Sequence, residues 1–256
     1  MLSQNQLRHI ASLKSKKFRD EHRQFIAEGH KLVTDLMESP YRFEGIYASA
    51  GWIVVNLKAI QSKKIPAFET TPREMERISA LSTPSPVLAV IDIPDSPVTR
   101  HASRVPDLCL ALDDIRDPGN MGTIIRVADW FGIETVICSE TCVDLYNPKV
   151  VQSTMGSIAR VKVAYANLEK WLDEVKESVP VYGTFLGGDL LYETELTPDG
   201  VILIGNESRG ISPELERLVT RRITIPSYGK AESLNASVAA AVVCAEFRRR
   251  DVTRDA

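Results

Sequence analysis

The sequence has few cysteines, no long apolar run and no grouped metal ligands, and each of these absences excludes a class of protein. Four cysteines occur among 256 residues, and their spacing fits no CxxC zinc pattern. We therefore expect reduced thiols in a cytoplasmic protein. No apolar segment approaches the length that spans a bilayer, and the basic N-terminus lacks the apolar core of a signal peptide. The four histidines form no cluster with ligand spacing, so we expect neither a metal site nor a membrane protein.

A strong positive charge is also absent, since the net charge is −3. This excludes a uniformly basic nucleic-acid-binding protein. Residues 1–25, however, contain six lysines and arginines and only two acidic residues. The spacing of Leu7, Ile10 and Leu13 predicts one helix over residues 3–17. This basic segment could contact phosphate groups or could simply be a solvated helix face, and the sequence leaves both interpretations open.

Apolar strands and amphipathic helices alternate along the chain in two successive parts. Hydrophobic residues make up 44% and charged residues 25% of the chain, as in ordinary globular proteins. A proline-bearing stretch without apolar periodicity separates the two parts. We predict a basic N-terminal helix in residues 1–20, a small α/β domain in 21–94, a linker in 95–107 and a second α/β domain in 108–256.

The second part consists of repeated strand and helix patterns, which predict a parallel sheet with helices on both faces. Its first strand, LCLALDDI at 108–115, is almost entirely apolar. We expect a loop at 116–122 that leads into a helix at 123–132. A further helix is expected at 213–222.

Three polar loops follow apolar strands of this predicted sheet, and open parallel sheets bind ligands beyond the carboxyl ends of their strands. The first loop carries Asn120, which we expect to cap the next helix, and Arg126 lies within that helix. The second loop, GNESRG, carries Glu207. The third follows the strand ITIP and brings Ser233 and Asn235 to the start of an alanine-rich helix.

Each loop taken alone has a simpler structural interpretation. Glu207 and Arg126 could form an ion pair that only stabilises the fold, and Ser233 and Asn235 could serve only as a helix cap. The phosphate-binding patterns GxGxxG and GxxxxGK[ST] are absent, which argues against an ordinary nucleotide-dependent enzyme. Because purely structural polar residues would be scattered over both ends of a sheet, the grouping of three loops favours one functional site.

The three loops also resemble the motifs of a known family. NMGTIIR resembles the first motif, N-x-G-x-x-x-R, of the SpoU, or TrmH-like, RNA ribose methyltransferases. VILIGNESRGIS resembles their second motif and IPSYGKAESLNASVAAAVV their third, in the family's order. The resemblance covers about residues 108–250. From FIAEGHKLVTDLME onward, the first part resembles the family's substrate-binding domain, which is itself similar to ribosomal protein L30e.

The resemblance implies an α/β fold in which the parallel sheet of the second domain contains a deep trefoil knot, and the knot forms the site for S-adenosylmethionine. It also implies a homodimer with the active site at the subunit interface. The residues implied to hold the cofactor are Thr184, Gly205, Ile225 and Leu234. Those implied to form the catalytic pocket are Asn120, Arg126, Glu207, Ser233 and Asn235.

The implied reaction is transfer of a methyl group from S-adenosylmethionine to a ribose 2′-hydroxyl of RNA, which needs no metal because the methyl donor is already activated. Arginine is effectively always protonated, so Arg126 is better suited to binding a phosphate than to removing a proton. The L30e-like domain favours ribosomal RNA, and transfer RNA is the alternative substrate. A non-catalytic RNA-binding protein of the same fold is a second alternative.

Overall fold

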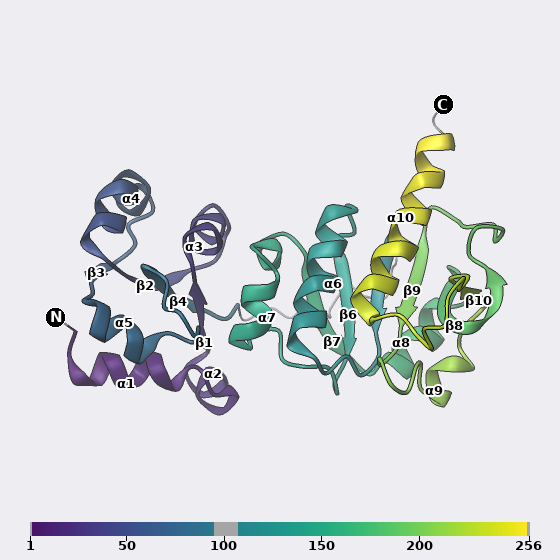
Figure 1. The fold of residues 1–256 in the computed structure, drawn as a ribbon, viewed down its shortest axis with the longest axis horizontal. Helices are drawn as coiled ribbons and strands as arrows, with labels where there is room; N and C mark the ends of the chain where they lie inside the picture. Colours follow the sequence, from purple (N-terminus) through teal and green to yellow (C-terminus); the bar gives the residue numbers. More distant parts are fainter. Residues whose placement is uncertain (1, 95–106, 255–256) are drawn as a thin grey trace. The chain divides into compact units, whose positions relative to one another are not determined.

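The computed structural model describes residues 2–94 and 107–254, which form two compact units (Figure 1). Within these residues, the first unit contains residues 2–94 and Asp144–Ala159, and the second unit contains the rest. The first unit thus includes a segment that the predicted boundaries place in the second domain. Most of the linker predicted at 95–107 lies outside the described residues. No described helix is both long and apolar enough to cross a membrane.

The first unit, in its described residues, is built on a four-stranded sheet with the order β1-β4-β2-β3. β4 pairs antiparallel with β1 and β2, whereas β3 pairs parallel with β2. The strands are β1 (Gln24–Glu28), β2 (Phe43–Ala48), β3 (Ala67–Glu69) and β4 (Val87–Asp92). The helices are α1 (Gln4–Ser12), α2 (Lys16–His22), α3 (His30–Met37), α4 (Ala50–Ser62), α5 (Pro72–Ile78) and α7 (Pro148–Ser153). Apolar side chains of α1 and α5 pack against β1 and β4 in one buried cluster.

The N-terminal segment forms two helices, so the prediction of one helix over 3–17 is wrong. The guanidinium of Arg19, on α2, donates to the carbonyl oxygens of Leu13 and Lys14 at 2.9 Å each. It also donates to the carboxylate of Asp144 at 2.6 Å. Arg19 therefore binds carbonyl groups that the end of α1 leaves without helical partners. Because its side chain is buried, this member of the basic segment is structural and is not available to phosphate groups.

The second unit contains a six-stranded sheet, within its described residues, with the order β10-β8-β9-β5-β6-β7. Every pair in this sheet is parallel, which confirms the predicted parallel α/β architecture. The strands are β5 (Leu108–Leu112), β6 (Thr135–Ser139), β7 (Lys162–Ala166), β8 (Val181–Leu190), β9 (Gly200–Ile204) and β10 (Arg221–Thr224). The helices are α6 (Pro118–Trp130), α8 (Leu168–Val175), α9 (Pro213–Glu216) and α10 (Ala236–Arg254). α6 and α10 pack side by side on one face, and α8 and α9 contribute to the core on the other (Figure 1).

Two predicted elements of the second unit are wrong. Residues 116–122 are not all loop, because α6 already begins at Pro118, a residue suited to the first position of a helix. Asp117 caps this helix by accepting a hydrogen bond at 2.8 Å from the backbone N–H of Asn120. Asn120 is therefore not the cap, and its side chain is free for other contacts. The helix predicted at 213–222 stops after α9, because the following residues pair with β8 as strand β10.

Candidate active site

Three amide and carboxylate side chains from distant parts of the chain form one hydrogen-bonded row at the carboxyl edge of the second sheet. Asn120, in the first turn of α6, donates from Nδ2 to Glu207 Oε1 at 2.5 Å. Asn235, just before α10, donates from Nδ2 to Asn120 Oδ1 at 2.8 Å. We call Asn235, Asn120 and Glu207 the amide row. The structure thus brings together three of the predicted catalytic residues, one from each motif.

The amide row has a fixed direction because its first member is held by the helix that follows it. The side-chain oxygen of Asn235 accepts hydrogen bonds from Ser237, at 2.9 Å from the backbone N–H and at 2.6 Å from the hydroxyl. The NH2 group of Asn235 must therefore face Asn120, whose oxygen accepts and whose NH2 group donates onward. The carboxylate of Glu207 ends the row as its acceptor. The predicted cap at the start of α10 is thus present, and it also orients the row.

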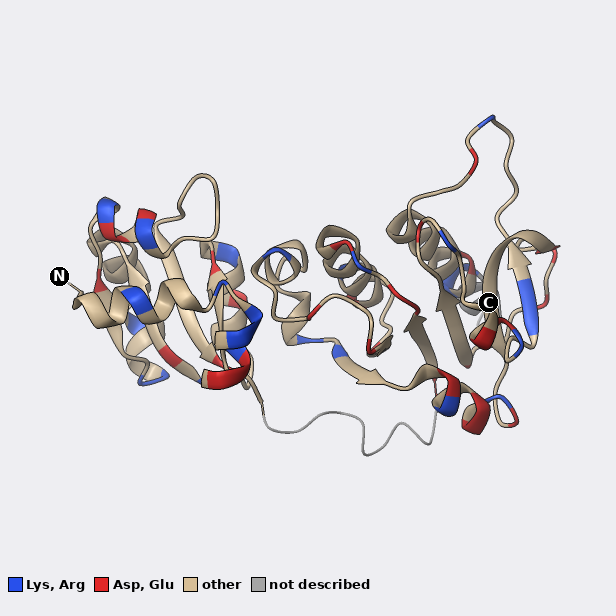
Figure 2. Cartoon of the chain, turned by 90° about the horizontal axis from the view of Figure 1, so that it is seen from below, with Lys and Arg blue, Asp and Glu red and all other residues tan. Residues whose placement is uncertain are grey.

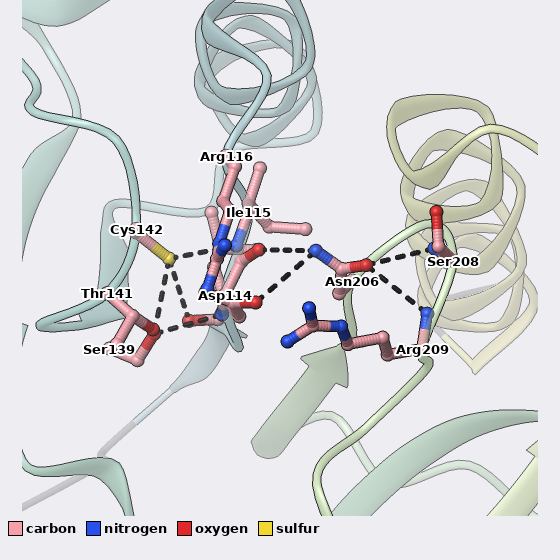
Figure 3. A network of polar contacts seen from close by, with 10 residues as sticks. Asp114, Ile115, Arg116, Ser139, Thr141, Cys142, Asn206, Ser208 and Arg209 are labelled. Carbon is pink, nitrogen blue, oxygen red and sulfur yellow. Dashed lines mark hydrogen bonds and ion pairs between the residues drawn. The ribbon is translucent and has the colours of Figure 1, made fainter.

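The loop between β9 and α9 holds Glu207 in position because backbone hydrogen bonds close the loop on itself. Asn206 and Gly210 exchange both backbone hydrogen bonds, at 3.0 and 2.8 Å. The side chain of Asn206 accepts from the backbone N–H groups of Ser208 and Arg209 and donates to the carbonyl of Asp114 at 2.8 Å (Figure 3). Asn206 was not predicted as a site residue, although its place two residues after a buried strand was a usable signal.

Three of the four residues predicted to hold a cofactor lie on or directly after neighbouring strands. Thr184 lies on β8, Gly205 directly follows β9 and Ile225 directly follows β10, and these strands are adjacent and parallel. Thr184 Oγ1 donates to the carbonyl of Leu203 on β9 at 3.2 Å, which ties β8 to β9 beside Gly205. Leu234 belongs to the segment between β10 and α10 and is 46% exposed. The sheet therefore places Thr184, Gly205 and Ile225 along one edge.

Two predicted catalytic residues make no contact with the amide row among the described residues. Arg126 is exposed on α6 and has no hydrogen bond or ion pair in the described part of the chain. It follows Asn120 by six helical positions, which turns it away by roughly 120° at 3.6 residues per turn. The alternative ion pair between Arg126 and Glu207 does not form in the described residues, and Glu207 accepts from Asn120. Ser233 is exposed in the segment before α10.

An unusually exposed apolar surface lies near Arg126. Trp130, one turn further along α6, is 82% exposed, although Trp52 and Trp171 are buried. Val238, near the start of α10, is 47% exposed. α6 and α10 pack against each other; Trp130 lies at the end of α6 that contacts Arg248, whereas Val238 lies at the start of α10 near Asn120. We call the exposed side of this helix pair, which carries these two side chains, the α6–α10 surface.

The cysteines are buried and form no disulfide among the described residues. Cys142 shapes the loop that leads into α6, since its sulfur accepts from the backbone N–H of Ile115 at 3.2 Å and donates to the carbonyl of Leu112 at 3.3 Å. A hydrogen bond from Cys138, together with those from its other neighbours, lowers the pKa of the Cys142 thiol. No group of three potential metal ligands occurs within the described residues.

Comparison with known proteins identifies both halves of the chain. Residues 107–245 match the model of the SpoU rRNA methylase family. Residues 4–89 match the model of the MRM3-like substrate-binding domain. Most of the predicted linker lies between the two matched ranges. The range 107–245 contains the whole amide row.

Full-length relatives agree with the two domain matches. The chain is 31% identical over 238 residues to the 23S rRNA (guanosine(2553)-2′-O)-methyltransferase RlmP of Bacillus subtilis, and the alignment covers 92% of this chain and 93% of that protein. A TrmH-family RNA methyltransferase structure from Porphyromonas gingivalis has a TM-score of 0.87 at 39% identity, with 98% and 99% of the two chains covered. An AdoMet-bound rRNA methyltransferase from Sinorhizobium meliloti has a TM-score of 0.86 at 30% identity, with 98% and 96% covered.

Proposed function

The chain belongs to the SpoU rRNA methylase family, and we propose that it transfers a methyl group from S-adenosylmethionine to a ribose 2′-hydroxyl of ribosomal RNA. The amide row carries this proposal, since it joins the three motifs at the edge of the sheet where a ligand is expected. The same row argues against a non-catalytic RNA-binding protein, which would have no need for a carboxylate and two amides held in one direction.

The residues at this edge fit S-adenosylmethionine. Thr184, Gly205 and Ile225 offer backbone groups and an apolar wall, and Leu234 exposes further apolar surface. This donor set suits an uncharged adenosine, and the methyl donor carries no phosphate that would require a glycine-rich phosphate loop. When bound, S-adenosylmethionine supplies an activated methyl group, so no metal is needed.

The catalytic residues have separate roles in this proposal. Asn235, together with Ser233, orients the ribose hydroxyl for in-line attack, because alignment of the reacting groups lowers the barrier most in such a displacement. Glu207 fixes Asn120 and hence the direction of the row. Arg126 binds the phosphate next to the target ribose through paired N–H donors.

We assign Arg126 to the active site of a second copy of the chain. Arg126 is exposed and turned away from the amide row of its own chain, and the exposed α6–α10 surface lies beside it. A two-fold dimer through this surface brings α6 of each copy towards the other. Family likeness also supports a deep trefoil knot around the segment that precedes α10, where Asn235 reaches α6.

A mixing experiment tests the shared site. Asn120→Ala and Arg126→Ala are each expected to abolish most activity as pure proteins. After unfolding and joint refolding in equal amounts, mixed dimers contain one intact site, so about a quarter of the wild-type activity should return by random pairing. No recovery, in a sample shown by sedimentation to be dimeric, would place Arg126 in the site of its own chain.

Ribosomal RNA is favoured over transfer RNA by the first unit. Its residues match an MRM3-like substrate-binding domain, and two of the relatives described above, from Bacillus subtilis and Sinorhizobium meliloti, are named as rRNA methyltransferases. Lys14, Lys16 and Lys17 remain exposed at the junction of α1 and α2, and Arg8 is exposed on α1, so the basic segment keeps cations for phosphate contacts (Figure 2). An enzyme with this substrate works in the compartment where ribosomes are assembled, which we take to be the cytoplasm.

Mapping of 2′-O-methyl groups in cells with and without the gene decides the substrate. We expect one position of ribosomal RNA to lose its methyl group when the gene is deleted, and the purified protein to restore it with S-adenosylmethionine. Loss of a transfer RNA methyl group instead would select the alternative substrate. Unchanged methylation in both pools, together with no calorimetric signal for S-adenosylmethionine, would overturn the proposed function.

A further inference from the structure

A cavity of about 510 Å³ lies at the carboxyl edge of the second sheet, and none of the amide-row residues lines it. Residues that follow β5, β6, β7 and β9 form its walls. β5 lies between β6 and β9, and the chain leaves β5 towards β6 but returns to β9 only after β8. This reversal of strand order is the point at which open α/β sheets bind ligands. The volume falls in the range of about 300–1,000 Å³ that is typical of ligand sites.

The wall between β5 and β9 is fixed by hydrogen bonds before any ligand binds (Figure 3). Asp114 has a positive φ of 55°, which is unusual for a residue other than glycine. Its backbone N–H donates to Ser139 Oγ at 2.9 Å, and its carbonyl accepts from Asn206 at 2.8 Å. Ser139 Oγ also lies 2.9 Å from Thr141 Oγ1. The loops after β5, β6 and β9 are thus held together with hydroxyl groups at the cavity.

Two arginines at the cavity have donor groups that the protein does not use fully. Arg209 has an exposed side chain without a hydrogen bond or ion pair among the described residues, and it extends from its loop towards Asp114 in Figure 3. Arg116 uses Nε to contact Asp114 at 2.8 Å, and its side chain is 60% exposed. Arginine binds phosphate through paired N–H groups, so both side chains are suited to that ligand.

The remaining lining contains four carboxylates and an apolar part. Asp113 accepts from the backbone N–H of Ser212 at 2.7 Å, Asp114 pairs with Arg116 and Glu169 pairs with Arg217, so three of the carboxylates have partners in the fold, and the fourth, Glu140, is exposed. Ala166, Leu168, Pro213 and Leu215 add an apolar part to the lining. An apolar wall with arginines and hydroxyl groups is the combination that binds an unstacked base with its phosphates.

We propose that this cavity receives a nucleotide of the RNA substrate beside the methylated one, with its base on the apolar wall and its phosphates at Arg116 and Arg209. The inference rests on the proposed function and adds a recognition site to it. One loop supports the link, because Glu207 of the amide row and Arg209 of the cavity are two residues apart. A nucleotide held in the cavity would thereby select which ribose reaches the amide row.

Kinetics with four variants test the cavity. The substrate is deproteinised ribosomal RNA from cells that lack the gene. Arg209→Ala removes a phosphate contact and Ala166→Phe fills the cavity, whereas Arg209→Lys keeps the charge. Lys170→Ala is the matched control, since Lys170 is exposed on neighbouring α8 but does not line the cavity.

We expect Arg209→Ala to raise the KM for RNA about 10-fold, the effect of losing one charge-assisted contact, and Ala166→Phe to raise it about as much by excluding the nucleotide from the cavity. Arg209→Lys should recover part of the loss, and Lys170→Ala should match wild type. Arg209→Ala should also lower the salt dependence of RNA affinity by about one counterion. Calorimetric affinity for S-adenosylmethionine should stay unchanged in all four proteins.

The outcomes separate this inference from the proposed function. If wild type methylates the RNA and both cavity variants keep its KM, the cavity does not bind RNA. If wild type methylates no RNA, the proposed function fails. The affinity for RNA, measured by filter binding, then shows whether the cavity binds RNA. In that case, weaker binding by the Arg209→Ala and Ala166→Phe proteins supports the inference, and equal binding by all variants overturns it. Because the side chain of Arg209 is exposed and makes no hydrogen bond or ion pair with the described residues, its replacement leaves the fold intact.

Discussion

Replacement of Gly205 by alanine tests the closure of the loop that presents Glu207. A Cβ atom at position 205 would lie 2.3 Å from the carbonyl carbon of Gly210 and 2.3 Å from the nitrogen of Ile211. Both are backbone atoms, so no side-chain rotation relieves the overlap. The bridge between Asn206 and Gly210 must therefore open, or the whole loop must shift.

The cost of this change follows from the contacts that the shift removes. The two backbone hydrogen bonds of the bridge measure 3.0 and 2.8 Å, and each contributes about 1 kcal/mol net. Residual overpacking adds about 1–3 kcal/mol. We expect the free energy of unfolding of the second unit to fall by about 3–5 kcal/mol, which lowers its thermal midpoint by about 6–20 °C.

Thermal unfolding and calorimetric binding of S-adenosylmethionine measure the effect. Gly187→Ala is the matched control for stability, because a Cβ atom there would meet no atom within 4 Å. The Gly205 variant should have a lower thermal midpoint than wild type and bind S-adenosylmethionine weakly. The Gly187 variant should have the same thermal midpoint as wild type. A wild-type midpoint for Gly205→Ala, or an equal loss in the control, would refute the reasoning.

Four further predictions concern the amide row, the first unit and, in two cases, the thiols. Asn120→Ala removes the centre of the row, so kcat in single-turnover assays should fall about 100-fold through misalignment while S-adenosylmethionine affinity holds. Arg19→Ala leaves Asp144 unpaired, and urea titration should show a loss of about 2–4 kcal/mol in the first unit alone, a result that equal stability would contradict. Burial raises the pKa of Cys109 and of Cys244 to about 12, so neither thiol should react with a thiol reagent at pH 8 before unfolding. The unfolded thiols ionise with an ordinary pKa near 9.0, so the raised pKa values of the folded state should cost stability as the pH rises from about 9 towards 12, which denaturant titrations at several pH values would detect.

The parallel sheet was predictable because its strands are almost continuously apolar, as strands covered on both faces must be. The start of α6 was predictable in principle but was missed. Pro118 and Gly119 suggested a loop, whereas an aspartate followed by proline is also the ordinary start of a helix. The predicted helix at 213–222 failed for a different reason. Pairing with β8 overrides the helical pattern beyond α9, and no local signal reports such a distant partner.

The sequence predicted which residues belong to the amide row, but not how they are arranged. The three motifs indicated that Asn120, Glu207 and Asn235 belong to one site, but their order and direction depend on hydrogen bonds between loops far apart in the sequence. The direction in which Arg126 points depends on where α6 begins. With Asn120 in a loop, Arg126 could point back towards it, whereas a shared helix fixes the two side chains on different faces.

The loop after β9 links the two sites that we propose. In this loop, Glu207 faces Asn120 and Arg209 faces the cavity. Asn206 precedes both residues and is hydrogen-bonded to Asp114. A rigid loop of this kind couples the position of a bound nucleotide to the direction of the amide row. Loosening the loop at Gly205 should therefore raise the KM for RNA as well as weaken methyl-donor binding, whereas Arg209→Ala should affect RNA alone. A Gly205 variant that is stable, binds S-adenosylmethionine weakly and keeps the wild-type KM for RNA would show that the two sites are independent.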